Sequence, residues 1–223
     1  MAVTMTCEVL IVAAFHPELA PLRPLLGDAM RARIDGHEVV ARVVGIGLPM
    51  AAVGTAMQLA ELQPRVVLLV GTCGAYPGSG IRIGDVVAPA RVRLADGTVA
   101  EGRAQFPEPM STLAEAHGPT VDALLRAGAL AGDAATTLAI TVDDVTAERI
   151  GRATATKSEH LEAYGVLTAC AARGVPCAAA LGVANVVGSR AREEWRTHHR
   201  PAASAAIDVV QRALRDPSFR PAG

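Results

Sequence analysis

With 223 residues, of which 51% are hydrophobic, the chain suits one globular domain with a sizeable core. Its formal net charge of −1 and its 3% of aromatic residues provide neither the basic surface nor the stacking rings that a nucleic-acid interface needs. No apolar run reaches the length of about 18 residues that spans a bilayer, and the first apolar run lacks the preceding Lys or Arg of a signal peptide. We therefore expect a cytoplasmic protein without nucleic-acid or membrane partners.

In chain order, strands and helices alternate. The hydrophobic pattern predicts a buried strand over 8–14, a hairpin over 31–44 with Asp35 and Gly36 in its turn, and a helix from Pro49 to Leu62. A continuous β-branched run predicts a central parallel strand over 65–70. The further predicted strands span 86–94, 136–141 and 176–183, and the further helices span 121–131, 159–173 and 201–215.

This alternation predicts the α/β class, as a three-layer α/β/α arrangement around one mixed, mostly parallel sheet. No repeat, linker or change of composition divides the chain, so we expect a single domain over 1–215 and a loose tail over 216–223. Ligands of such sheets bind at the carboxyl ends of the strands. Four places should meet that edge, namely 15–18, 71–75, 143–162 and Asn185.

The cysteine pattern argues against disulfides and metals. The four cysteines form neither a CxxC pair nor a dense framework, which is typical of reduced thiols in a cytosolic protein. Glu194 and His198 stand four residues apart but do not form the HExxH motif, and we expect a solvated helix face there. The sequence therefore predicts no metal site.

The glycine-rich stretch GTCGAYPGSGIRIGD, residues 71–85, follows the predicted central strand and is expected to be a loop. It leads into another strand rather than a helix, which excludes the dinucleotide fingerprint, and it lacks the Lys-Ser or Lys-Thr of a P-loop. A tight structural turn without a ligand remains an alternative at this point.

Four segments carry a more specific pattern when they are taken together. They are VAAFHPELAPLR with Glu18 and Arg23, the stretch GAYPGSGIRIGDVV, the segment from Ser158 to Asn185 with Glu159 and Glu162 before its Gly-Val-Pro turn, and NVVGSRAREEW with Trp195. In this order they resemble the purine nucleoside phosphorylase and nucleosidase superfamily. Within it they look most like futalosine hydrolase and methylthioadenosine/adenosylhomocysteine nucleosidase.

The resemblance implies a phosphorylase/hydrolase-like fold and an N-ribosyl hydrolase without metal or organic cofactor. It also implies a small-molecule purine nucleoside as substrate, a 6-oxopurine nucleoside such as futalosine in particular, and hence a place in menaquinone biosynthesis. Members of the family commonly form dimers or larger rings, so we expect a homo-oligomer in which the apolar helix over 50–62 serves an interface.

Cleaving an N-ribosidic bond places positive charge on the ribose and negative charge on the departing base. Glu162 is the expected carboxylate that grips the ribose hydroxyls and offsets the cationic sugar. Glu18 is the expected base that orients or deprotonates the attacking water. Asn185 is expected to hold the base, because its amide can donate to O6 of a 6-oxopurine and accept from a protonated N7.

The resemblance also implies residues that contact the substrate. Those expected to line the sugar and the base are Thr72, Cys73, Gly74, Phe106, Val142 and Leu161. Phe106 and Tyr76 are equally compatible with a place in the core. Glu159, by contrast, is expected to be a solvated helix residue, and Cys73 lacks the basic partner that a nucleophilic thiol needs.

Departures from the family pattern keep alternatives open. Phosphorylases have an arginine where this chain has Leu69, and a phosphate dianion without that arginine would be poorly compensated, so hydrolysis is favoured over phosphorolysis. Nucleosidases tend to have Arg-Ala-Ile-Ser where this chain has residues 181–184, and Leu161 replaces a methionine. A catalytically inactive nucleoside-binding homologue therefore remains an alternative, as does a phosphorylase.

Overall fold

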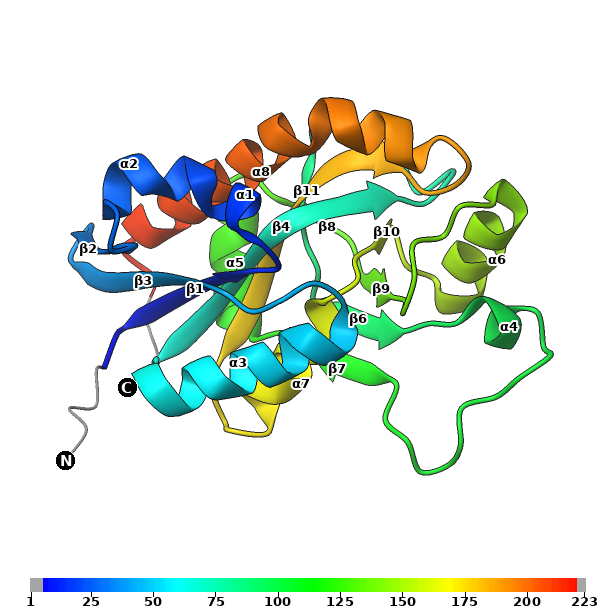
Figure 1. The fold of residues 1–223 in the computed structure, drawn as a ribbon, viewed down its shortest axis with the longest axis horizontal. Helices are drawn as coiled ribbons and strands as arrows, with labels where there is room; N and C mark the ends of the chain where they lie inside the picture. The colour runs from blue at the N-terminus through cyan, green and yellow to red at the C-terminus, as the bar shows by residue number, and fades with distance from the viewer. Residues whose placement is uncertain (1–5, 220–223) are drawn as a thin grey trace.

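The computed structural model describes residues 6–219, whose strands form one 11-stranded mixed sheet flanked by helices (Figure 1). The strands are Val9–Ala13 (β1), Arg31–Ile34 (β2), His37–Val43 (β3), Val66–Ala75 (β4), Val86–Ala88 (β5), Arg91–Leu94 (β6), Leu113–Glu115 (β7), Leu130–Ala131 (β8), Ala134–Thr136 (β9), Ser158–Glu159 (β10) and Cys177–Val186 (β11). The helices are His16–Leu19 (α1), the 3₁₀ turn Ala20–Leu22 (η1), Arg23–Leu26 (α2), Leu48–Leu62 (α3), Gly97–Ala100 (α4), Gly118–Arg126 (α5), Asp144–Thr154 (α6), Ala163–Ala171 (α7) and Ala191–Arg215 (α8).

The sheet is branched at its longest strands. One path runs β2-β3-β1-β4-β10-β9-β6-β7, while β11 pairs with β4 and β5, and β8 pairs with β5. Parallel pairing joins β1 to β3 and β4, and β4 to β11, whereas the β2–β3 hairpin and the β10–β4 pair are antiparallel. The predicted α/β class with a mixed, mostly parallel sheet is therefore confirmed.

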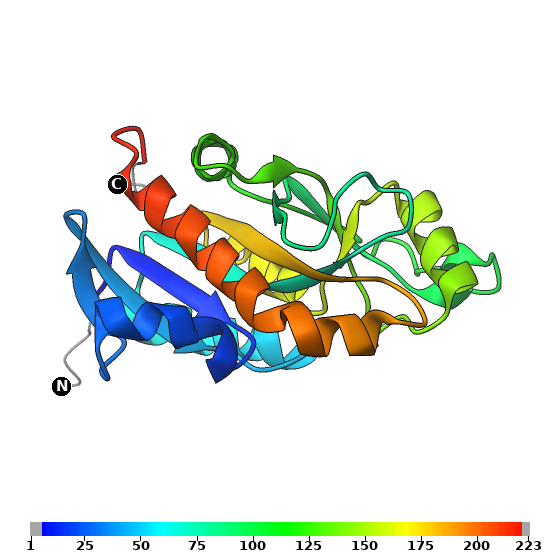
Figure 2. The ribbon, with the colours of Figure 1, turned by 90° about the horizontal axis from the view of Figure 1, so that it is seen from above.

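Both faces of the sheet are buried, which gives the three layers (Figures 1 and 2). Alternate residues of β4 point to opposite sides, so Val66 and Leu68 pack beneath α1, α2, α5 and α8, while Val67 and Leu69 pack against α3 and α7. Strands covered on both faces read as continuous apolar runs, which is why 65–70 could be identified from the sequence.

The glycine-rich segment after this run differs from the prediction. Residues 71–75 are not a loop but the second half of β4, where β11 pairs on one side and β10 on the other. These two neighbours supply the backbone hydrogen bonds that a strand needs, and the prediction from the glycines alone was wrong. Gly74 is required because a Cβ there would lie 2.7 Å from Val187 Cγ2 and 2.8 Å from Asn185 Nδ2.

The boundaries of several other elements differ from those predicted. The hairpin with Asp35 and Gly36 in its turn is confirmed, and α3 begins one residue before Pro49. The predicted strand over 86–94 is two strands, β5 and β6, and the predicted helix over 159–173 is β10 followed by α7. The closing helix begins ten residues before Pro201, which lies inside α8.

The ends of the described chain and its cysteines can be placed as well. Within the predicted tail, Asp216 accepts a hydrogen bond from Arg126 Nε at 2.8 Å and Phe219 is buried with its ring edge-on to His37, while 220–223 lie outside the described residues. The four cysteines are free and buried. None of the helices between residues 6 and 219 is long and apolar enough to cross a membrane.

A close backbone contact joins β11 to α8. A Cβ on Gly182 would lie 2.0 Å from the carbonyl oxygen of Ala202, an atom that the surrounding helix prevents from moving aside. Glycine at this position therefore lets the long helix lie directly on the central strand.

We expect Gly182→Ala to lower the free energy of unfolding by about 1–3 kcal/mol or more, because a methyl group has no room there. Gly118→Ala is the matched control, since a Cβ on Gly118 meets no atom within 4 Å at the start of α5. Denaturant unfolding of both variants tests this, and equal stability of the two would contradict the packing described.

Candidate active site

Glu18 is buried at the carboxyl end of β1, within the short helix α1. Its Oε1 accepts hydrogen bonds from the backbone N–H of Thr72 at 2.9 Å and from the Thr72 hydroxyl at 3.1 Å. Its Oε2 accepts from the backbone N–H of Ala14 at 3.2 Å. The residue is only 4% exposed, so these three donors replace the water that a carboxylate would otherwise bind.

This environment changes the acidity of Glu18. Burial raises the pKa of its carboxyl to about 7, the donors from Thr72 and Ala14 oppose the rise, and the nearby charge of Glu162 adds to it. A carboxylate whose pKa lies near neutral pH is suited to accept a proton in a reaction, because a large share of it is ionised at that pH and the ionised form is basic enough to take the proton.

Glu162 stands at the N-cap position of α7, immediately before the helix. Its Oε1 accepts a hydrogen bond of 2.7 Å from the backbone N–H of Gly47, the N-cap residue of α3. Among residues 6–219, no donor bonds to its Oε2. A buried carboxylate with one oxygen fixed and the other unpaired can accept from hydroxyl groups of a ligand.

His160, a residue that the sequence did not single out, lies between these two carboxylates. Its Nδ1 accepts from the backbone N–H groups of Glu162 at 3.2 Å and Ala163 at 3.1 Å. A Cβ on Gly71 would lie 3.1 Å from both His160 Nε2 and Glu18 Oε1. The sequence feature that could have pointed to His160 is its position two residues before Glu162, in the segment that leads from β10 to α7.

Asn185 reaches the same stretch of β4 from the neighbouring strand. It is buried in β11 directly opposite Gly74, where the register shifts between Val183 and Asn185. Its Nδ2 donates to the carbonyl oxygen of Val186 at 3.0 Å, which fixes the side-chain amide. The structure therefore brings Glu18 and Asn185 to one segment of β4, residues 71–74, and places Glu162 close enough for its charge to act on Glu18.

Thr72 joins this site to the long helix α8. Besides contacting Glu18, its hydroxyl accepts a hydrogen bond of 3.1 Å from Nε1 of Trp195. The indole ring stacks on His199 with ring centroids 4.4 Å apart, and the centroid of the Phe15 ring lies 6.3 Å from it. Trp195, which the sequence analysis named in the segment NVVGSRAREEW, thus helps to fix Thr72.

The other residues predicted to bind substrate occupy varied places. The Cys73 thiol points into the core, where it donates to the carbonyl of Leu181, and burial raises its pKa to about 12. Leu161 is half-buried beside Glu162, and Phe106 is half-buried in the loop after α4. Val142 is 68% exposed just before α6.

The prediction for Glu159 was wrong. The residue was predicted to be a solvated helix residue, but it is buried in β10. Its carboxylate accepts from the Tyr76 hydroxyl at 3.0 Å, the Thr141 hydroxyl at 2.7 Å and the Thr141 N–H at 3.1 Å, and burial raises its pKa. The antiparallel pairing with β4 turns this side chain inward, which a helical interpretation of 159–173 could not foresee.

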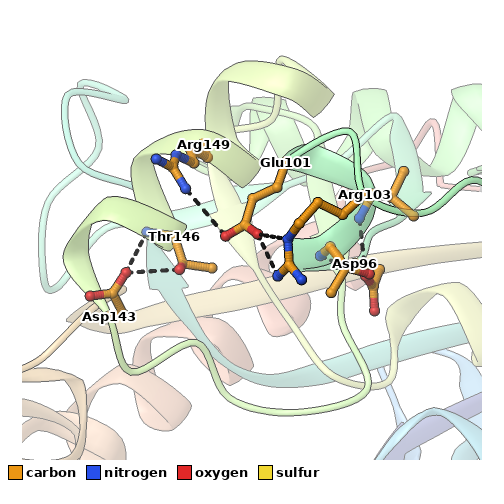
Figure 3. A network of polar contacts seen from close by, with 8 residues as sticks. Asp96, Glu101, Arg103, Asp143, Thr146 and Arg149 are labelled. Carbon is orange, nitrogen blue, oxygen red and sulfur yellow. Dashed lines mark hydrogen bonds and ion pairs between the residues drawn. The ribbon is translucent and has the colours of Figure 1, made fainter.

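Contacts in the first half of α6 hold the segment around Val142 in place. Figure 3 shows Asp143 capping the helix through Thr146, and Arg149 reaching Glu101, which also pairs with Arg103. On the other side, Asp144 accepts from the Ser189 N–H at 2.7 Å and the Ser189 hydroxyl at 3.0 Å. The ion pairs are exposed, so each stabilises the loop only slightly, but together they define its position.

Two further features concern metal binding and the hollows of the surface. Between residues 6 and 219, no group of three or more His, Cys, Asp or Glu side chains is arranged to hold a metal ion. A hollow of about 580 Å³ lies over α1, α2 and β3, and none of the predicted site residues lines it.

Comparison with known proteins adds a family. A model of the phosphorylase superfamily matches residues 8–215. The 5′-methylthioadenosine/S-adenosylhomocysteine nucleosidase of Maridesulfovibrio salexigens is 42% identical over 64 residues, and that of Colwellia psychrerythraea is 32% identical over 96 residues. These segments cover 29% and 39% of this chain, and only 27% and 39% of the relatives' own length.

Solved structures are similar over nearly the whole chain. The Colwellia psychrerythraea nucleosidase in complex with adenine has a TM-score of 0.82 at 22% identity, covering 95% of this chain and 96% of that one. The futalosine hydrolase of Helicobacter pylori strain 26695 has a TM-score of 0.82 at 14% identity, covering 94% and 97%. At these identities the likeness establishes the fold.

The Tyr76–Glu159 contact provides a stability test. We expect Tyr76→Phe to lower the free energy of unfolding by about 1–3 kcal/mol, because a buried carboxylate loses a hydrogen-bond donor. Tyr164→Phe is the control: its hydroxyl bonds to the Ser111 carbonyl at the surface, and its loss should cost less than about 0.5 kcal/mol. Denaturant unfolding measures both losses of stability, and a larger loss in Tyr164→Phe than in Tyr76→Phe would contradict a stabilising role for the buried Tyr76–Glu159 hydrogen bond.

Proposed function

Because the chain belongs to the phosphorylase superfamily, we propose that it is a purine nucleosidase, an enzyme that hydrolyses the N-ribosidic bond of a purine nucleoside. The observation that carries the proposal is that two buried carboxylates, Glu18 hydrogen-bonded to β4 and Glu162 beside His160, lie close enough for the charge of Glu162 to contribute to a Glu18 pKa of about 7. Two buried carboxylates beside each other are costly, and such an arrangement is typical of catalytic sites.

In the proposed reaction the two carboxylates have different tasks. Glu162 accepts hydrogen bonds from ribose hydroxyls through Oε2 and offsets the positive charge that develops on the sugar. Glu18 accepts a proton from water, whose oxygen forms the new bond to C1′ of the ribose. The C1′–N bond breaks with its electron pair on the purine, and solvent water protonates the departing base because an asparagine amide cannot.

Hydrolysis is favoured over phosphorolysis by the surroundings of β4. Leu69, where phosphorylases have an arginine, is completely buried in the core, so no guanidinium can reach a phosphate from that position. The two carboxylates would also repel a dianion in the same space. We therefore propose water rather than phosphate as the nucleophile.

For the base, Asn185 supports a 6-oxopurine nucleoside such as futalosine. A side-chain amide can donate to O6 and accept from a protonated N7, whereas an ionised aspartate would prefer the exocyclic amine of adenine. The relatives named as methylthioadenosine/adenosylhomocysteine nucleosidases make an adenine nucleoside the competing substrate. Methylthioadenosine, inosine and futalosine, each without and with phosphate, distinguish these possibilities through the free base released.

We also propose that the protein forms a homo-oligomer through α3 and the loop before it. This surface presents apolar side chains to solvent at Ile46, Met50, Val53 and Met57. Exposed apolar patches of this kind typically mark protein interfaces. Light scattering would give the mass, and a monomer at micromolar concentration would argue against the proposal.

Neutralising either carboxylate tests the assignment of roles. We expect Glu18→Gln and Glu162→Gln each to lower kcat by roughly 100-fold or more, because the base or the charge that stabilises the sugar is lost. Glu148→Gln is the control, since this glutamate is exposed on α6. Steady-state release of free base measures all three, and unchanged turnover in either site variant would remove that residue from the mechanism.

Exchanging the amide for a carboxylate tests base selection. In Asn185→Asp we expect the ratio of kcat/KM for methylthioadenosine to that for inosine to rise by at least about tenfold, because the new group favours a 6-amino over a 6-oxo base. The two substrates are assayed on the same preparation, with thermal unfolding as a check on folding. A ratio unchanged from wild type would show that Asn185 does not contact the base.

A further inference from the structure

The space beside Gly71 is bordered by a hydrogen-bond acceptor, Glu18 Oε1, and by a ring nitrogen, His160 Nε2. Glu18 Oε1 and His160 Nε2 each lie 3.1 Å from the point that a Cβ on Gly71 would occupy, so they lie within twice that distance of each other. A glycine leaves the space between them open, and any larger residue would fill it.

The contacts of His160 determine which ring nitrogen carries hydrogen. Nδ1 accepts two backbone N–H groups, from Glu162 and Ala163, and must therefore be unprotonated. Burial holds the pKa of this imidazole below its usual range, which favours the neutral form despite the nearby Glu162. The hydrogen is then on Nε2, and Nδ1 and Glu162 Oε2, 3.3 Å apart, are two acceptors rather than an ion pair.

The Nε2–H group lacks a protein acceptor. The side chain of His160 is only 2% exposed, and none of the residues between 6 and 219 accepts a hydrogen bond from Nε2. Nε2 is not one of the completely enclosed unpaired polar atoms among residues 6–219, so a small ligand such as water can reach this donor and accept from it. The acceptor must fit between this donor and the carboxylate of Glu18.

We propose that His160 binds the attacking water, which accepts a hydrogen bond from Nε2–H and donates one to the carboxylate of Glu18. This inference rests on the proposed nucleosidase function. A water held in this way keeps a lone pair for C1′ while its proton passes to Glu18, and His160 remains neutral throughout.

A purely structural role would also explain part of the geometry, because Nδ1 caps the first N–H groups of α7. Two substitutions separate the roles. In His160→Asn the amide oxygen can take the place of Nδ1 as the cap, but nothing reaches the place of Nε2. In His160→Gln the longer side chain can present an N–H group near Nε2, but the cap is lost.

The test measures kcat, KM and thermal stability of both variants, with whichever of inosine, futalosine and methylthioadenosine the wild type hydrolyses fastest. We expect His160→Asn to retain its Tm and nearly its KM while kcat falls at least tenfold, and His160→Gln to recover part of that kcat despite a lower Tm. The split between kcat and KM identifies a group that acts on the nucleophile rather than on substrate binding.

The reverse ranking, with His160→Asn as active as wild type and His160→Gln losing stability and activity together, would overturn the inference and leave His160 as a helix cap. A wild type that hydrolyses none of the three nucleosides would instead contradict the proposed function itself. The two failures are therefore distinguishable from the same set of measurements.

Discussion

The backbone of β4 between Gly71 and Gly74 is the feature on which the site depends. The Thr72 N–H holds Glu18, the open space above Gly71 faces His160, and Gly74 leaves room for Asn185. This arrangement requires β4 to continue as a strand beyond the apolar run, which pairing with β11 and β10 allows. The glycines are therefore not loop residues but the means by which side chains from three other segments approach one strand.

Burial gives the carboxylates their chemical character. Glu18 and Glu159 are both removed from solvent and bonded to hydroxyl and N–H donors, and the pKa of each is raised because those donors do not fully replace water. Glu159 uses its donors to fix the chain around Thr141, whereas Glu18 faces a second carboxylate, Glu162. The same physical environment thus serves an anchor in one case and, in our proposal, a proton acceptor in the other.

Much of the fold and part of the site could be predicted from the sequence. Continuous apolar runs identified β1 and β4, because strands covered on both faces leave a clear pattern. The burial of Glu159 and the extension of β4 could not be predicted, since both depend on pairing with the two-residue strand β10, which is too short to leave a periodic signal. His160 was missed for a related reason, because the role of a single histidine depends on the groups near it in space, and these cannot be identified from the sequence.

In the proposed reaction the buried Glu18, whose pKa is raised to about 7, is the base that accepts the proton of the attacking water. The most direct measurement is the pH dependence of kcat/KM for the hydrolysed nucleoside. The ionised form is the active one, so kcat/KM should fall tenfold per pH unit below about 7 and reach a plateau above it. A profile that stays flat down to pH values near the ordinary pKa of a glutamate, about 4.3, would contradict this role of Glu18.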